Sequence, residues 1–313
     1  MYNIYDYGRM LAEPVRLEAY KGALRAAVKP GAVVLDIGTG TGFFALYAAS
    51  LGARKVYGVE PVAEALAIAK RTASMNGYAD RIEFFEGLST ALDLPEKADV
   101  IVSDLRGRLP LYGRHLAALV DAKSRHLADG GALLPLRDHL FCAPIEAPQL
   151  HHRIVGGFED QGFDLSACRD AVINLLHTDD GATVLSEQLV AEPVRFATLE
   201  YGVFDGPVRG QAAFAVTRAS TVHGLALWFD AEIDAHHGFS LRPGHEGAVY
   251  GRLFLAWPEP VRMSQDTRIA VEITALPTRN DYVWAFVSHV EHAGFPSKVI
   301  RQSTFLAAGR PTR

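Results

Sequence analysis

Between residues 30 and 135, short apolar runs of this 313-residue chain alternate with segments of helical periodicity. The runs with strand character are AVVLDIG, KVYGVE, RIEFFEG, ADVIVSDL and GGALLP, and helix-like segments separate the first three of them. Strands that are apolar throughout and alternate with helices are typical of a parallel sheet covered on both faces. This alternation predicts an α/β domain in the first part of the chain.

After Pro135 the pattern changes to short aromatic and β-branched runs. These runs include ATLEYGVF, AAFAVTRA, GLALWFDAEI, RLFLAW, RIAVEITAL and YVWAFVSHV, and clusters of Gly, Pro and Asp separate them. Such spacing is typical of an antiparallel barrel or sandwich, which only a partly helical insertion at about 149–170 interrupts. We therefore predict two domains, residues 1–137 and residues 138–313.

Composition excludes several classes of partner and site. A net charge of −5 gives no reason to expect binding to nucleic acid or to an acidic membrane surface. The N-terminus MYNIYDYGRM lacks the apolar core of a signal peptide, and no run approaches the roughly 20 apolar residues of a membrane span. Cys142 and Cys168 fit neither a disulfide framework nor a zinc site.

The histidine pairs at 151–152 and 236–237 lack the spacing of a helical metal site. We expect a cytoplasmic protein without metal, with both pairs facing solvent.

A glycine-rich turn follows the first predicted strand. Gly38, Gly40 and Gly42 stand between this strand and the next helix, where glycine lets the backbone approach a ligand closely. Asp36 ends the strand just before the turn. An acid facing the turn would repel a pyrophosphate, but it suits the amino group of a zwitterionic tail.

A second acid supports the same ligand. Glu60 ends the second predicted strand, 24 residues after Asp36, and an acid at this place can accept both ribose hydroxyls. Together the two acids favour S-adenosylmethionine over a nicotinamide dinucleotide. The alternative is a structural turn with incidental acids.

With these residues in place, the chain resembles a class I methyltransferase and, more narrowly, the protein arginine methyltransferase family. The segments that carry the resemblance are MLAEPVRLEAY, DRIEFFEG, LPEKADVIVSD, LADGGALLP, QGFDLSACRD, GFSLRPG and NDYVWAFV. The resemblance implies a seven-stranded Rossmann-like domain fused to an antiparallel β-barrel. It also implies a helical arm at about 149–170 that closes a head-to-tail homodimer.

The resemblance assigns further cofactor contacts. Met10 would pack near the sulfonium, and Arg16 would pair with the cofactor carboxylate. Adenine would rest near Ser89 and Thr90, although Leu88 takes a place where a polar residue is common in related folds. The remaining candidates for this site, next to the acids and glycines, are Pro61 and Ser103.

The loop after the strand ADVIVSDL departs from the family. In the family this loop carries two glutamates nine residues apart that clamp the substrate guanidinium. Here Asp104 takes the first place and Gly113 the second. Arg106, Arg108 and Arg114 make the loop basic, so a single shorter carboxylate cannot repeat the clamp.

The barrel departs from the family as well. The family's Thr-His-Trp loop is replaced by Ala248-Val249-Tyr250, and His245 lies three residues before this triplet. Candidate pocket residues of this part of the site are therefore His245 and Tyr250, together with Tyr7 from the N-terminal segment.

These departures predict a methyltransferase that acts on an N or O nucleophile of a non-arginine acceptor, a small molecule or a peptide. Asp104 would orient the nucleophile and take its proton. The first alternative is an arginine N-methyltransferase, acting on protein or free arginine, with a remodelled clamp. The second is a catalytically inactive scaffold that binds the cofactor.

Overall fold

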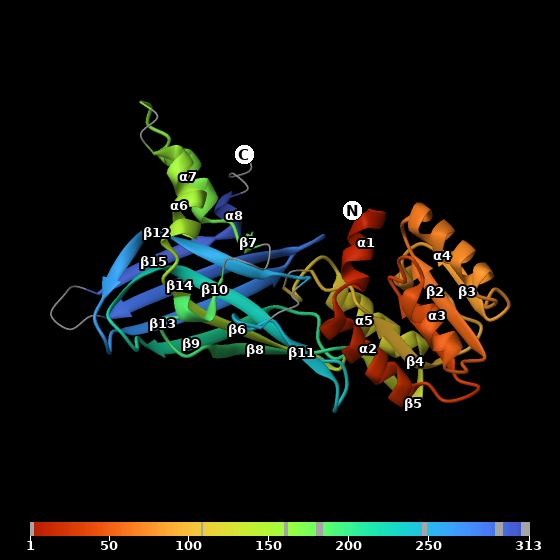
Figure 1. Ribbon diagram of the computed structural model, residues 1–313. Helices are drawn as coiled ribbons and strands as arrows, with labels where there is room; N and C mark the ends of the chain where they lie inside the picture. Colours follow the sequence, from red (N-terminus) through yellow and green to blue (C-terminus); the bar gives the residue numbers. More distant parts are fainter. Residues whose placement is uncertain are drawn as a thin grey trace.

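The computed structural model describes residues 3–107, 109–159, 162–179, 184–245, 249–291 and 297–307. Figure 1 shows the parallel sheet and its helices at one end of an elongated molecule and the antiparallel strands at the other. The two N-terminal helices lie between these parts.

A five-stranded parallel sheet forms the first part, with the order β3-β2-β1-β4-β5. Its strands are β1 (Val33–Ile37), β2 (Lys55–Glu60), β3 (Ile82–Glu86), β4 (Ala98–Ser103) and β5 (Leu127–Leu134). The helices α3 (Phe43–Ser50), α4 (Ala63–Met75) and α5 (His115–His126) and the short η1 (Ser89–Ala91) connect them. The central strand β1 is buried along its whole length, which explains its uninterrupted apolar sequence.

The expectation of seven strands is wrong for the residues that the structure describes. After β5 the chain does not return to the parallel sheet. It passes Pro135 and enters β6 (Arg137–Ile145), which pairs antiparallel with β10 (Ser220–Glu232) and β8 (Val194–Glu200). The parallel sheet of the described residues therefore ends with β5.

Two helices precede the parallel sheet. Helix α1 (Ile4–Leu11) begins with a capping box in which Asn3 and Asp6 exchange hydrogen bonds. Helix α2 (Pro14–Ala27) is capped by the preceding Glu13, whose carboxylate accepts from two backbone N–H groups of the first turn. No residue of α1 is buried, whereas α2 buries one face, including Arg16 and Tyr20.

The second part consists of two antiparallel sheets, as the sequence predicts. One has the order β7-β12-β10-β6-β8, with β11 paired to β10, and the other the order β15-β14-β13-β9. The remaining strands are β7 (His177–Asp179), β9 (Val208–Ala215), β11 (Gly238–Ser240), β12 (Arg252–Met263), β13 (Arg268–Pro277), β14 (Tyr282–Glu291) and β15 (Lys298–Ser303). Burial alternates along β13 and β14, because one face of their sheet is turned to the core.

The insertion at about 149–170 contains α6 (Pro148–Val155), η2 (Gly156–Phe158) and α7 (Ser166–Ile173). Figure 1 shows α6 and α7 projecting beyond the antiparallel strands, beside α8 (Thr304–Ala307). A further short helix, η3 (Ser186–Gln188), follows β7. Among the described residues, no helix is both long and apolar enough to cross a membrane.

The expectation that both histidine pairs face solvent is wrong for His151. This side chain is buried, and its Nε2 atom lies 2.8 Å from the carbonyl oxygen of Trp257. Helix α6 carries it onto the antiparallel sheet, which the spacing of the pair could not show. His152 and His236 are exposed and His237 is half-buried.

Candidate active site

The glycine turn between β1 and α3 lies directly against α1. Gly38, Gly40 and Gly42 have φ angles of 73°, 54° and 87°, which favour glycine because a side chain would be strained there. A Cβ atom on Gly40 would lie 2.5 Å from the Tyr7 ring. The turn therefore needs glycine both for its conformation and for the close approach of Tyr7.

Two acids stand at the carboxyl ends of neighbouring strands β1 and β2. The buried Asp36 carboxylate accepts a hydrogen bond from Thr39 Oγ1 at 2.6 Å. Burial raises the pKa of Asp36 to about 7, although the hydrogen bond from Thr39 acts in the opposite direction. Glu60 accepts from the backbone N–H groups of Gly40 and Val62, both at 3.0 Å, so it also holds the glycine turn in place.

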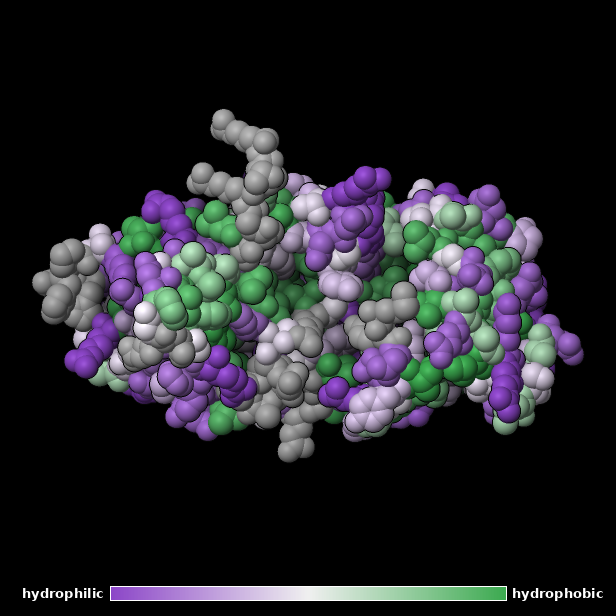
Figure 2. Space-filling model, turned by 90° about the horizontal axis from the view of Figure 1, so that it is seen from above, coloured by the Kyte–Doolittle hydropathy of each residue, from purple (hydrophilic) through white to green (hydrophobic). Residues whose placement is uncertain are grey.

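Two neighbouring cavities open beside this turn. The first cavity, of about 400 Å³, is bounded by α1, the glycine turn, Glu60, Asp104 and Tyr250. The second cavity, of about 550 Å³, is bounded by the segment after β3 and by the start of α5. Gly38, Pro61, Leu105 and Tyr112 line both cavities, so the two are continuous along the carboxyl ends of the parallel strands. Figure 2 shows the surface hollowed between the two ends of the molecule.

Most of the predicted site residues line these cavities. Those in the first cavity are Tyr7, Met10, Arg16, Gly38, Gly40, Glu60, Pro61, Asp104, Arg106 and Tyr250. Those in the second are Gly38, Pro61, Ser89, Thr90 and Arg114. Asp36 and Ser103 are buried behind the lining residues, and Asp36 reaches the first cavity through Thr39.

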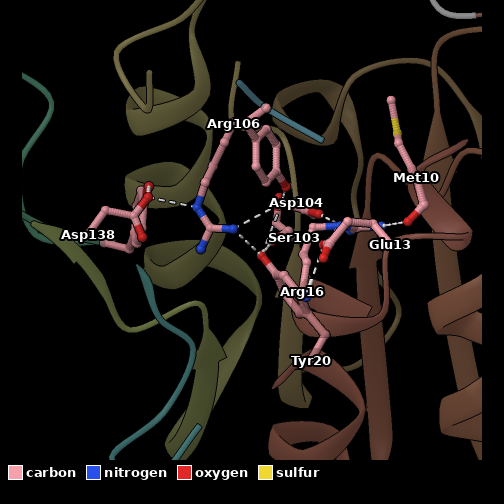
Figure 3. Close-up of polar contacts among 10 residues, drawn as sticks. Met10, Glu13, Arg16, Tyr20, Ser103, Asp104, Arg106 and Asp138 are labelled. Carbon is pink, nitrogen blue, oxygen red and sulfur yellow. Dashed lines mark hydrogen bonds and ion pairs between the residues drawn. The ribbon is translucent and has the colours of Figure 1, made fainter. Parts of the chain in front are cut away.

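Asp104 follows β4 and is held by four donors (Figure 3). Its Oδ2 atom accepts from Arg16, whereas Oδ1 accepts from Arg106 Nη1 at 3.0 Å, Tyr20 at 3.2 Å and Tyr250. Burial opposes ionisation, but the charges of Arg16 and Arg106 and the hydrogen bond from Tyr250 keep the pKa of Asp104 below its ordinary value. Asp104 is therefore an ionised carboxylate on the wall of the first cavity.

Arg106 joins the two parts of the molecule. Its Nε atom donates to Asp138 Oδ2 at 2.7 Å, and its Nη1 atom donates to the Tyr20 hydroxyl at 2.7 Å. The Tyr201 hydroxyl donates to the same Asp138 oxygen at 2.6 Å. The side chains of Arg106 and Asp138 are both fully buried. The guanidinium predicted to meet substrate is thus held by the protein's own carboxylates.

Sequence reasoning did not single out Tyr20, Asp138 and Tyr201. Tyr20 carries a usable signal, because it lies four residues after Arg16 on the same helix and so on the same face. Asp138 and Tyr201 carry none, since they come from the antiparallel part and meet Arg106 only through the fold.

The other basic and barrel candidates do not surround Asp104. Arg114 is exposed and lines the second cavity together with Gly113. His245 is exposed, and among the described residues it lines neither cavity; its carbonyl oxygen accepts from Arg252. Arg108 and Ala248 lie outside the described residues. Across the part of the chain that the structure describes, no three His, Cys, Asp or Glu side chains are grouped to hold a metal.

Comparison with known proteins agrees with this geometry. A family model described as a methyltransferase domain matches residues 34–131. Protein arginine N-methyltransferase 6 of Danio rerio is 30% identical over 291 residues, covering 87% of this chain and 82% of the relative. Its counterpart from Xenopus laevis is 29% identical over 282 residues, covering 86% and 83%.

Solved structures share the fold. The PRMT1 enzyme–prozyme heterotetrameric complex of Trypanosoma brucei with AdoHcy superimposes with a TM-score of 0.82, at 22% identity and over 95% of this chain and 97% of the other. Arabidopsis thaliana protein arginine methyltransferase 10 gives a TM-score of 0.81, at 21% identity and over 96% and 97%. The chain belongs to the protein arginine N-methyltransferase family and is an S-adenosylmethionine-dependent methyltransferase.

Proposed function

We propose that this methyltransferase transfers the methyl group to a nitrogen atom of its acceptor, with protein arginine as the first candidate. The names of the relatives favour arginine over the non-arginine acceptor that the altered loop predicts. The domain ranges 1–137 and 138–313 are part of this proposal. The first would bind the cofactor and the second would complete the acceptor pocket with Tyr250.

S-adenosylmethionine supplies an electrophilic methyl group on a sulfonium. In this chain Glu60 would accept the ribose hydroxyls, and Ser89 and Thr90 would bound adenine in the second cavity. Arg16 would turn from Asp104 to the cofactor carboxylate, while Met10 would pack beside the sulfonium. The residues fit this ligand because the glycine turn with its acids lines the first cavity and the mainly apolar second cavity adjoins it. The buried Arg16, which pairs with Asp104, also lines the first cavity.

The observation that carries the proposal is the ionised Asp104 carboxylate on the wall of the first cavity. Its Oδ2 atom has only Arg16 as a partner among the described residues. Once Arg16 turns to the cofactor, Oδ2 would be available to an N–H group of the acceptor. Asp104 would then orient the nitrogen behind the methyl group, and positioning of this kind supplies most of the enzyme's contribution to a direct displacement.

A second candidate is a neutral or anionic acceptor. The observation that favours it is the pairing of Asp104 Oδ1 with Arg106, together with a glycine at 113 where the family has its second glutamate. A guanidinium is held best by paired carboxylates, and here an internal arginine already uses part of one.

An acceptor panel with labelled S-adenosylmethionine tests the proposal. The panel contains arginine-rich peptides, the same peptides with citrulline in place of arginine, and acidic and neutral small molecules. Transfer to the arginine peptides, but not to the citrulline peptides, supports the first candidate. Transfer only to acceptors without a guanidinium replaces it with the second. A protein that binds the cofactor but labels no acceptor contradicts both.

We also propose a homodimer in which residues 149–170 dock on the partner's methyltransferase domain. The support is the projection of α6 and α7 from the antiparallel part (Figure 1) and the exposed apolar side chain between them, Phe163, which is 82% exposed. An exchanged arm of this kind normally makes a symmetric contact.

A further inference from the structure

Arg106 occupies a binding site for a guanidinium in which its Nε and Nη1 atoms are paired. Two carboxylates hold it, Asp104 after β4 and Asp138 in β6. Four aromatic rings surround its central carbon, with centroids between 5.5 and 5.9 Å away. These rings belong to Tyr20, Tyr201, Phe229 and Phe239. Paired carboxylates and aromatic faces are the groups that recognise an arginine side chain, and here the chain's own arginine fills them.

The charges of the four paired groups in this cluster balance. Asp104 and Asp138 contribute two negative charges, and Arg16 and Arg106 contribute two positive charges. If Arg16 turns to the cofactor carboxylate, as proposed above, the cluster keeps one net negative charge. A cationic acceptor would then meet Asp104 with the positive charge of Arg106 only 3.0 Å from the same carboxylate. In a buried site, screening by water is weak, so this repulsion counts.

We propose that Arg106 is a specificity-determining residue of the acceptor pocket. Its charge lowers the affinity of the pocket for a guanidinium relative to a neutral acceptor of the same shape. Asp138 reduces this effect, because its negative charge partly compensates the charge of Arg106. The inference rests on the proposed function, because it assumes that the acceptor approaches Asp104. It makes Arg106 a positioning residue that acts through Asp104 rather than a group that touches the methyl group.

Two variants move the pocket charge in opposite directions. Arg106→Gln removes the positive charge and keeps an amide that can donate to Asp138. Asp138→Asn removes a compensating negative charge and leaves Arg106 in place, and its amide oxygen can still accept from Tyr201. Arg106→Lys keeps the charge and serves as the conservative control. A purely structural role for Arg106 would weaken the fold in all three but would not change the preference between two isosteric ligands.

The measurement is peptide binding to the full chain saturated with S-adenosylhomocysteine, which does not depend on turnover. The probes are a fluorescein-labelled arginine–glycine repeat peptide and its citrulline counterpart, which is neutral and nearly isosteric. The readout is the Kd of the citrulline peptide divided by the Kd of the arginine peptide. We expect this ratio to rise at least about tenfold in Arg106→Gln and to fall about threefold or more in Asp138→Asn. Arg106→Lys should keep the wild-type ratio.

An unchanged ratio in both charge-altering variants overturns the proposal, and so does a change in the same direction in both. If Arg106→Gln does not fold, the direction of the change in Asp138→Asn still decides. Calorimetric titration of each variant with S-adenosylhomocysteine separates the two proposals. A wild-type protein that does not bind S-adenosylhomocysteine would contradict the proposed function. If all proteins bind S-adenosylhomocysteine but the ratio of the two peptide Kd values stays constant, only the role of Arg106 is contradicted.

Discussion

At the scale of single residues, burial and pairing give two carboxylates of this site opposite properties. Asp36 lies behind the glycine turn, and burial raises its pKa to about 7. Asp104 is also buried, but two arginines keep its pKa below the ordinary value. Near neutral pH, Asp104 is therefore ionised while Asp36 is only partly so. Of these two carboxylates, only Asp36 can change its charge near neutral pH.

This difference predicts how cofactor affinity depends on pH. Below pH 7 the unliganded protein holds Asp36 protonated, whereas the amino group of the cofactor, if it lies beside Asp36 as the sequence predicts, would favour the ionised form. Binding must then release a proton, so affinity for S-adenosylhomocysteine should fall up to about tenfold per pH unit below 7 and level off just above it. Calorimetry between about pH 5.5 and 8 checks this. Asp36→Asn should bind weakly with no such slope, and parallel profiles of the two proteins would contradict the role of Asp36.

The contacts of single residues also show which parts of the site could be predicted from the sequence and which could not. The acids and glycines of the turn could be predicted, because neighbouring parallel strands bring their carboxyl ends together. The partners of Asp104 could not be predicted in full. Arg106 is close in sequence, but the side chain that fixes its direction, Asp138, starts a strand of a different sheet. The sequence also could not show that Arg106 would line the first cavity and Arg114 the second.

At the scale of elements, α1 is an exposed wall of the first cavity. It has no buried residue, and Ile4 and Tyr5 are 43% and 74% exposed. Three of its residues, Tyr7, Met10 and Leu11, nevertheless line the first cavity. Elements with few buried apolar contacts unfold locally at a small cost in free energy. Because α1 has few such contacts of its own, contacts with a ligand in the cavity would raise this cost substantially.

We therefore expect the cofactor to order α1. Hydrogen exchange of the amides in Ile4–Leu11 should slow at least about tenfold when the protein is saturated with S-adenosylhomocysteine. Strand β13 should not change, because its ten residues lie in an antiparallel sheet away from both cavities. Equal exchange of α1 with and without ligand would show that it does not cover the cofactor.

Elements were predicted well where their local pattern is strong. The five parallel strands and the helices between them follow from apolar runs that the sheet buries on both faces. The count of seven strands came from the family resemblance, whereas the sequence itself has five runs of strand character before the change of pattern at Pro135, and these are the five parallel strands observed. Pairing partners depend on contacts between distant segments, which periodicity does not report.

At the scale of the whole molecule, the candidate active site lies where the two parts meet. Asp104 and Arg106 come from the parallel part, while Asp138, Tyr201 and Tyr250 come from the antiparallel part. The hydrogen bonds of Arg106 to Asp138 and of Tyr250 to Asp104 cross this junction. The antiparallel part therefore helps to shape the site as well as carrying the projecting helices.

The proposed dimer predicts a mass of twice the 34.0 kDa of the chain by light scattering at micromolar concentration. Phe163 is the most exposed large apolar side chain among the described residues, and Phe163→Asp should yield monomers because a charge cannot be buried in an apolar contact at low cost. Val203→Asp is the matched control, since Val203 is 67% exposed in the turn between β8 and β9 and should leave the dimer intact. A wild-type protein of 34.0 kDa would contradict the proposal.

The central claim is that Asp104 positions the acceptor in a cofactor site that other residues build. The most direct test compares methyl transfer from labelled S-adenosylmethionine by the wild-type protein and by Asp104→Asn, using the acceptor that the panel identifies. Asparagine keeps the size of the side chain and can still accept hydrogen bonds from Tyr20 and Tyr250. We predict that kcat falls about 10²–10⁴-fold while the Kd for S-adenosylhomocysteine changes by less than about threefold. Transfer by Asp104→Asn at the wild-type rate would contradict the account.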